Sequence, residues 1–427
     1  MIFKDLSLPA KLERIATMEV LRKNAEYITK NAIKAVLPDE AVKRALKGRN
    51  FEDRVILVAI GKAAYQMAKT AREILGDRMD RGIVITKYDH VKGPIEGCEC
   101  WEAGHPVPDE NSFRATEKAV ELVSGLKAED TVIFLISGGG SALFEKPLIP
   151  GEEIQDITAQ LLKSGASITE INTIRKRLSQ VKGGRFAELC SPAKVYSIVL
   201  SDIIGDPLDM IASGPAYPDS STCEDALDIA KKYKLSLSDT ARECLRHETP
   251  KELSNVETVI TGSVRELCRA AAAACEELGY ETEILTDSLD CEAKDAGKWL
   301  AGIAREHSST DHKLAFIAGG ETIVHITGTG LGGRNQELAL AAAEGISGMK
   351  AAVFSVGSDG TDGPTNAAGG YVDGESAGEF FAAGIDVAQV LKDNDSYHAL
   401  EAMGGLIITG PTGTNVNDFA CVLVEPL

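Results

Sequence analysis

One local pattern recurs along the chain: a short, wholly apolar run, then glycine, then residues with helical spacing. Val55–Ile60 is followed by Gly61 and a helical stretch, and Val132–Ile136 is followed by Ser137–Ser141. Continuous apolar runs of strand length are typical of strands that are covered on both faces by crossover helices. The pattern therefore predicts an α/β fold built around parallel sheet.

A chain of 427 residues is too long for a single domain with one hydrophobic core, and its length suits two domains. Residues 236–256 are polar and unperiodic, and the strand–helix pattern restarts after them. We predict two lobes with the active site in the cleft between them: an N-terminal Rossmann-like parallel-sheet domain over 1–240, and a C-terminal α/β domain over 241–427. The second sheet should be mixed, because Glu321–Thr327 alternates like a half-exposed antiparallel strand.

The charge balance excludes some classes of partner. With 64 acidic residues against 45 Lys and Arg, the net charge is −19, which argues against nucleic acid and against an anionic membrane. No signal segment or membrane-spanning run is recognised, so we expect a cytoplasmic protein. The nine cysteines form no disulfide framework, and Cys98 and Cys100 make a weak zinc signal because no second pair accompanies them.

Glycine loops follow several predicted strands. The three glycines of Ser137–Ser141 let backbone approach a ligand, and consecutive N–H groups could cradle a phosphate; the alternative is a tight turn. The candidate phosphate-binding residues are Ser137, Gly138, Gly139, Gly140 and Ser141. A second Gly/Thr loop, Gly410–Asn415, contains Thr412 and suits a phosphate, a ribose or a bare turn.

The loop Gly328–Gly333 matches G-x-G-x-x-G, which admits a nicotinamide-dependent oxidoreductase as an alternative. Two details weaken that reading. The acid Asp359 lies further along than the ~20 residues of the fingerprint. Arg334 opens the following helix and suits an anion held outside the sheet.

Basic residues are unevenly placed. Asn172–Arg185 carries five Lys or Arg residues and no acid, which favours either an anion grip that includes Lys182 or a solvated helix face. Lys62 directly follows a predicted strand and glycine, so it either points into the cleft at a helix N-terminus or extends over the surface.

Acids occupy matching positions after two other strands. Asp202 and Asp206 follow one, and Asp359 and Asp362 follow another. Paired carboxylates could hold Mg²⁺ beside substrate phosphates, but the same residues also make ordinary turns.

Taken together, several segments resemble the glycerate 2-kinase family, in the order in which that family has them. The matching segments are Ala59–Ala64, Gly104–Asp109, Ser137–Ser141, Asn172–Gly184, Ser201-Asp202, Ser213–Pro215, Gly333–Glu337, Ser358–Pro364 and Gly410–Asn417. The resemblance implies ATP-dependent phosphorylation of D-glycerate at its 2-hydroxyl, a divalent cation such as Mg²⁺, and a MOFRL region over about 310–420. It also places the family's active-site lysine and arginine on Lys62 and Arg334.

The prediction can be stated residue by residue. We expect catalysis by Lys62, Arg334 and Asp202, and a metal held among Asp202, Asp206 and Asp359. We expect substrate or phosphate to contact the Ser137–Ser141 residues together with Asn172, Arg175, Lys182, Asn335, Glu337 and Thr412. The expected partners are the small molecules D-glycerate and ATP, and a homodimer stays open. Phosphorylation at the 3-hydroxyl, hydroxypyruvate reduction and ligand binding without catalysis are the alternatives.

Overall fold

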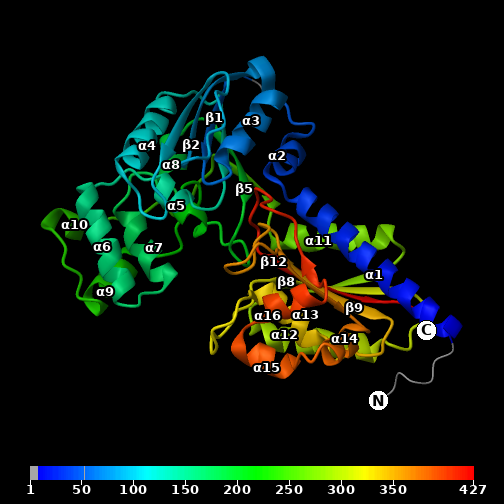
Figure 1. Cartoon of the computed structure of the whole chain (residues 1–427). Coiled ribbons are helices and arrows are strands. Elements are labelled where there is room, and N and C mark those ends of the chain that lie inside the picture. The colour runs from blue at the N-terminus through cyan, green and yellow to red at the C-terminus, as the bar shows by residue number, and fades with distance from the viewer. Residues whose placement is uncertain (1–7, 52) are drawn as a thin grey trace. The chain divides into compact units, whose positions relative to one another are not determined.

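The computed structural model describes residues 8–51 and 53–427, and this part of the chain divides into two compact units (Figure 1). The middle unit is Pro38–Thr261, and the split unit combines the chain up to Leu37 with Gly262–Leu427. This division differs from the expected 1–240 and 241–427 at both ends of the middle unit.

The middle unit is built on a six-stranded sheet in the order β3-β2-β1-β4-β5-β6. Its strands are β1 (Val55–Ile60), β2 (Met79–Lys87), β3 (Cys98–Ala103), β4 (Thr131–Ile136), β5 (Lys194–Leu200) and β6 (Val256–Gly262). The pairings from β3 through β5 are parallel. This is the strand order of a Rossmann fold, so the Rossmann-like prediction is confirmed.

Helices cover both faces of this sheet. Alternate residues of β1 enter two different cores, Ile56 and Val58 on one face and Val55 and Leu57 on the other. Because both faces are covered, the strand shows no polar alternation. The helices are α2 (Pro38–Leu46), α3 (Ala64–Leu75), α4 (Glu110–Leu122), α5 (Gly140–Leu143) and α8 (Arg185–Leu189), with short 3-10 turns at Gly76–Arg78 and Ile211–Ser213.

A helical cluster of the same unit has its own apolar core. It comprises α6 (Gly151–Lys163), α7 (Ile168–Arg177), α9 (Cys223–Lys232) and α10 (Asp239–Cys244). Residues 236–256, expected as a linker, therefore contribute a packed helix and lead into β6, the edge strand of the sheet. Polar composition here marks an exposed helical cluster, so the unit continues past residue 240.

The split unit has a mixed sheet in the order β11-β10-β9-β12-β8-β7, as predicted. Its strands are β7 (Glu281–Leu289), β8 (Leu314–Gly320), β9 (Ala351–Gly357), β10 (Gly369–Asp373), β11 (Leu406–Ile407) and β12 (Asp418–Val424). β7 pairs with β8 in parallel, and the other pairings are antiparallel.

The first helix belongs to this unit because its apolar side chains fill one face of the mixed sheet. Leu21 and Ile28 share a core with Phe354 and Phe419, and the helix lies beside α11 (Figure 1). The helices are α1 (Leu8–Ala35), α11 (Val264–Glu277), α12 (Ala293–Glu306), α13 (Arg334–Ala342), α14 (Ser376–Ala382), α15 (Val387–Asp393) and α16 (Ser396–Ala402).

One predicted strand is wrong. Glu321–Thr327 forms no strand, and its only β contact among the described residues is a bridge between Glu292 and Ile323. Ile323 and Ile326 are exposed and line a pocket. Over 8–51 and 53–427, no helix is long and apolar enough to cross a membrane.

Candidate active site

The strand order of the middle unit has a topological switch point between β1 and β4, where ligands usually bind at the carboxyl ends of the strands. The backbone N–H of Lys62, after β1, donates to the carbonyl of Gly138, after β4, at 2.9 Å. The Ser137 hydroxyl accepts from the Ala63 N–H at 3.1 Å and donates to the Ile60 carbonyl at 3.1 Å. Ser137 therefore ties the two loops together.

Three side chains converge on the glycines of this loop. A Cβ on Gly138 would lie 2.4 Å from Oδ2 of Asp202, and a Cβ on Gly139 would lie 3.0 Å from the His105 ring and 3.2 Å from Cγ of Lys62. Gly139 also has φ of 84°, in the left-handed region. The absence of side chains here lets Lys62, Asp202 and His105 approach one stretch of backbone.

His105 is not among the catalytic or binding residues predicted from the sequence. Burial, followed by the charges of Lys62 and Lys87, lowers the pKa of His105. The imidazole is therefore neutral near pH 7, so one ring nitrogen can donate a hydrogen bond and the other can accept one. In the sequence, His105 stood out only through the family resemblance of Gly104–Asp109 and as a possible companion of Cys98 and Cys100 in the weak zinc signal.

The basic segment Asn172–Arg185, which runs from α7 to the start of α8, is not a solvated face, and its role toward an anion stays a prediction. Lys182 is fully buried and donates to the carbonyls of Ser141 and Phe144 at 2.7 and 2.9 Å. Arg175 donates to the Ser141 carbonyl at 2.9 Å, and both cations face Glu145. Burial lowers the pKa of Lys182 to about 8. Buried charges require partners, and these two cations find theirs in Glu145 and in the Ser141 carbonyl. They therefore fix the position of the end of the glycine loop.

Asn172 takes part in the same network. Its Oδ1 accepts from the Ser213 hydroxyl at 2.9 Å, and Ser213 lies 2.6 Å from the Ser141 hydroxyl. Gly140 begins α5, so the end of the glycine loop is already helical. Ser213 thus links Asn172 to Ser141 through hydrogen bonds. The role of Asn172 and Ser141 toward a ligand stays a prediction.

The loop after β5 contains an unusual carboxylate. Oδ1 of Asp206 is buried and has no hydrogen-bond partner among the described residues. Asp206 also has a positive φ of 52°. A buried carboxylate oxygen without a hydrogen-bond donor is suited to bind a cation.

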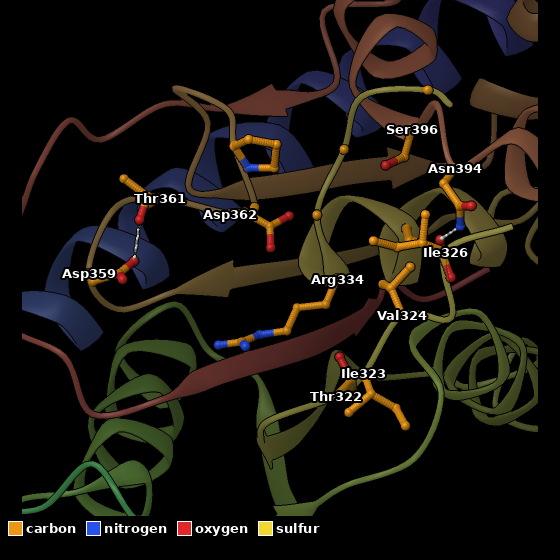
Figure 2. A pocket seen from close by; sticks show the side chains of 16 residues that line it. Thr322, Ile323, Val324, Ile326, Arg334, Asp359, Thr361, Asp362, Asn394 and Ser396 are labelled. Atoms are coloured by element: carbon orange, nitrogen blue, oxygen red, sulfur yellow. Dashed lines mark hydrogen bonds between the residues drawn. The ribbon is translucent and has the colours of Figure 1, made fainter. Parts of the chain in front are cut away.

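In the split unit, Arg334 is the first residue of α13 and lines a pocket of about 530 Å³ (Figure 2). Its Nε and Nη2 donate to the two carboxylate oxygens of Asp418 at 2.5 and 3.1 Å, and its Nη1 donates to Glu321 at 2.7 Å. A guanidinium has five N–H donors, so Nη1 and Nη2 each keep one. The side chain is fixed, yet it retains donors for a ligand.

The carboxylate of Asp362 caps α13. It accepts from the backbone N–H groups of Asn335 and Gln336 at 3.1 and 2.9 Å, and burial raises its pKa. The glycine loop Gly328–Gly333 therefore leads into the N-terminus of α13, where the carboxylate of Asp362 already accepts from the first backbone N–H groups. A dinucleotide pyrophosphate would need that position, which weakens the oxidoreductase alternative.

The other predicted residues of this unit have structural contacts. The Asn335 side chain is buried and accepts from Ser355 at 2.6 Å, and burial raises the pKa of Glu337, which accepts from Asn394. Asp359 accepts from the backbone and hydroxyl of its neighbour Thr361. Its carboxylate is thus engaged in a turn at the pocket edge.

Thr412 is held against the same turn. Its hydroxyl donates to the Ser358 carbonyl at 2.6 Å, and its N–H donates to the Asp359 carbonyl at 3.2 Å. Within 8–51 and 53–427, no three acidic, His or Cys residues form a preassembled metal cluster. The predicted metal residues Asp202 and Asp206 belong to the middle unit and Asp359 belongs to the split unit, and their role toward a metal stays a prediction.

Comparisons with known proteins agree with this architecture. A family described as a domain of unknown function (DUF4147) matches residues 24–246, and the MOFRL family matches residues 314–418. A Thermotoga maritima protein named D-glycerate 2-kinase is 56% identical over 413 residues, covering 95% of this chain and 99% of that protein. A Pyrococcus horikoshii protein named glycerate 2-kinase is 40% identical over 421 residues, covering 92% and 95%.

The fold comparison gives the same relatives. A crystal structure of a Thermotoga maritima glycerate kinase has a TM-score of 0.91 and 56% identity, covering 95% of this chain and 100% of that chain. A sequence identity of 56% over nearly the whole chain indicates membership of the same family as well as a shared fold. This chain belongs to the glycerate 2-kinase family, with its MOFRL region at residues 314–418.

Proposed function

We propose that this protein is a glycerate kinase that transfers the γ-phosphoryl group of ATP to the 2-hydroxyl of D-glycerate, giving 2-phosphoglycerate and ADP. The observation that carries the proposal is the placement of Lys62 and Asp202 at the glycines of the β4 loop. The printed names of the relatives, D-glycerate 2-kinase and glycerate 2-kinase, support the choice of substrate and of hydroxyl.

Lys62 acts on the phosphoryl group in this proposal. A phosphoryl group in flight carries charge on its outer oxygens, and catalysis consists mainly of positioning and electrostatic stabilisation. The Lys62 side chain is exposed and passes over Gly139, where no Cβ blocks an approaching phosphate. The N–H groups of a glycine loop at a strand end can add neutral donors.

Asp202 is the base of the proposed reaction. Its carboxylate lies against Gly138, on the same loop that Lys62 contacts. A carboxylate there can accept the proton of the 2-hydroxyl as its oxygen bonds to phosphorus and the bond to ADP breaks. His105, neutral near pH 7, is available to hydrogen-bond the substrate beside it.

The residues of the β5 loop fit Mg²⁺. Mg²⁺ prefers hard oxygen ligands and commonly uses one or two carboxylates together with substrate phosphates, so a three-carboxylate cluster is not required. The buried, unpartnered Oδ1 of Asp206 is the oxygen that we propose to hold it. When bound, Mg²⁺ neutralises phosphate charge during transfer.

Arg334 is proposed to bind the glycerate carboxylate. Asp418 and Glu321 orient the guanidinium, and the remaining N–H groups on Nη1 and Nη2 can donate to a carboxylate. Arg334 lines a pocket with a mixture of apolar and polar residues, which suits a small polar acid.

The decisive experiment incubates the protein with ATP, Mg²⁺ and D-glycerate and assigns the phosphorylated carbon by phosphorus–proton NMR. We expect 2-phosphoglycerate, and no product in excess EDTA. A Lys62→Ala protein prepared in parallel controls for a contaminating kinase. A 3-phospho product would refute the regiochemistry, and turnover of hydroxypyruvate with a nicotinamide cofactor, without phosphoryl transfer, would refute the kinase assignment.

A further inference from the structure

A second pocket of the split unit, of about 730 Å³, has a different lining from the pocket that contains Arg334. We call it the α12–α15 groove. α13 contacts both α12 and α15, so these two helices form the walls and the end of α13 forms the floor. The groove shares no lining residue with the Arg334 pocket.

Cations dominate the rim of the α12–α15 groove. Lys294, Lys298 and Arg305 line it from α12, and Lys392 lines it from α15, against the single acid Glu344 in the lining. Lys298 and Arg305 are seven residues apart, which is about two turns of one helix face. A local positive field of this kind is notable in a chain with a net charge of −19.

Internal acids do not account for all of these cations. Lys294 pairs with Glu292 at 3.0 Å, and the nearest acid to Lys298 is Asp295 at 3.9 Å. Arg305 and Lys392 are exposed and have no ion pair among the described residues. The α12–α15 groove therefore presents charge that an anion from solution can neutralise.

The bottom of the groove is apolar. Ala301, Ala341 and Val387 are buried there, and Leu391 is half-buried. An inorganic anion would contact the rim alone, whereas a ligand with a planar or apolar body would also cover these side chains. The volume lies within the ~300–1,000 Å³ of small-molecule sites.

From the cationic rim and the apolar floor together, we propose that the α12–α15 groove is a second binding site, for a phosphorylated small molecule with an apolar or aromatic body, such as a nucleoside phosphate. Its phosphates face Lys298, Arg305 and Lys392, and its body lies over Ala301 and Leu391. The site binds its ligand without taking part in phosphoryl transfer, because the groups assigned to that reaction lie outside it.

Calorimetric titration with ADP at low salt tests this proposal. The groove variant is Lys298→Glu with Arg305→Glu. Its matched control is Lys23→Glu with Lys30→Glu, two exposed lysines of α1 in the same unit, which gives the same change of net charge. Circular dichroism and melting curves confirm that both proteins fold.

We expect the groove variant to bind one ADP fewer per chain than the wild type, or to bind it at least about tenfold more weakly, while the control binds normally. Lys392→Glu, on the other wall, should weaken the same event. Because the readout is a difference between variants, it does not depend on whether the catalytic assignment is correct.

Identical isotherms for the groove variant, the control and the wild type would overturn the proposal. A parallel titration with inorganic pyrophosphate tests the apolar floor. Pyrophosphate binding to the groove as tightly as ADP would overturn the assignment of an apolar or aromatic body, and weaker binding supports it.

Discussion

The backbone N–H of Lys62 donates to the carbonyl of Gly138 at 2.9 Å, which joins the turn after β1 to the loop after β4. The relationship matters because the two strands are neighbours in a parallel sheet, so their carboxyl ends reach the same edge. The position of the Lys62 side chain is thereby set by the sheet, together with the glycines over which it passes.

Lys62→Ala should lower kcat by about 100- to 1,000-fold and change the KM for glycerate little. The physical reason is that the ammonium group stabilises charge that develops chiefly in the transition state. Steady-state kinetics check the result, with Lys69→Ala as the control, because Lys69 is an exposed lysine of the same helical region. A rise in KM alone would assign Lys62 to substrate binding.

Gly138→Ala should lower kcat by about 100-fold, because a Cβ would lie 2.4 Å from Oδ2 of Asp202 and displace the carboxylate. The control is Gly378→Ala, since no atom lies within 4 Å of a Cβ at Gly378. Kinetics and chemical unfolding of both variants separate the effects on activity and stability. Wild-type kcat in Gly138→Ala would show that the position of Asp202 does not limit the reaction.

Arg334→Ala should raise the KM for glycerate about ten- to hundredfold, because a charged two-point contact is worth about 1.5–3 kcal/mol. Arg334→Lys should restore little, since an ammonium group cannot reproduce the guanidinium fork. Steady-state kinetics should show that Arg334→Ala raises the KM for glycerate more than it lowers kcat.

The same substitution should also cost about 3 kcal/mol of unfolding free energy, because it leaves the buried carboxylate of Asp418 without its partner. Urea unfolding measures this loss, and Arg269→Ala, which breaks an exposed ion pair with Glu266, should cost far less. Unchanged KM in a folded Arg334→Ala protein would place the carboxylate contact elsewhere.

His105 should make stability depend on pH below 6.5. Burial lowers the pKa of the folded-state imidazole from its ordinary value of 6.5. Below that value the unfolded chain binds a proton that the folded chain resists, so the free energy of unfolding falls as pH falls. His105→Gln should reduce this fall between about pH 7 and pH 5. Parallel slopes for both proteins would contradict the assigned shift.

Much of this protein was determined locally by its sequence. Buried parallel strands such as Val55–Ile60 are apolar throughout, and glycines follow them because close backbone approach tolerates no side chain. These features predicted the Rossmann-like sheet and the position of Lys62 after β1. The mixed second sheet was expected from Glu321–Thr327, which forms no strand, and its antiparallel pairings come from other segments. The sequence features did not predict the split unit, because helix periodicity in α1 shows which face is buried but not against which sheet.

The tertiary structure decided what the charged residues contact. Lys182 and Arg175 look in sequence like an exposed anion grip, yet they support the Ser141 carbonyl from inside the protein. Asp362 belongs to a pair of acids that suited either a metal or a turn, and in the structure it caps α13. Charge and spacing specify what a side chain can bind, whereas its actual partner depends on which distant segments the fold brings within hydrogen-bond distance.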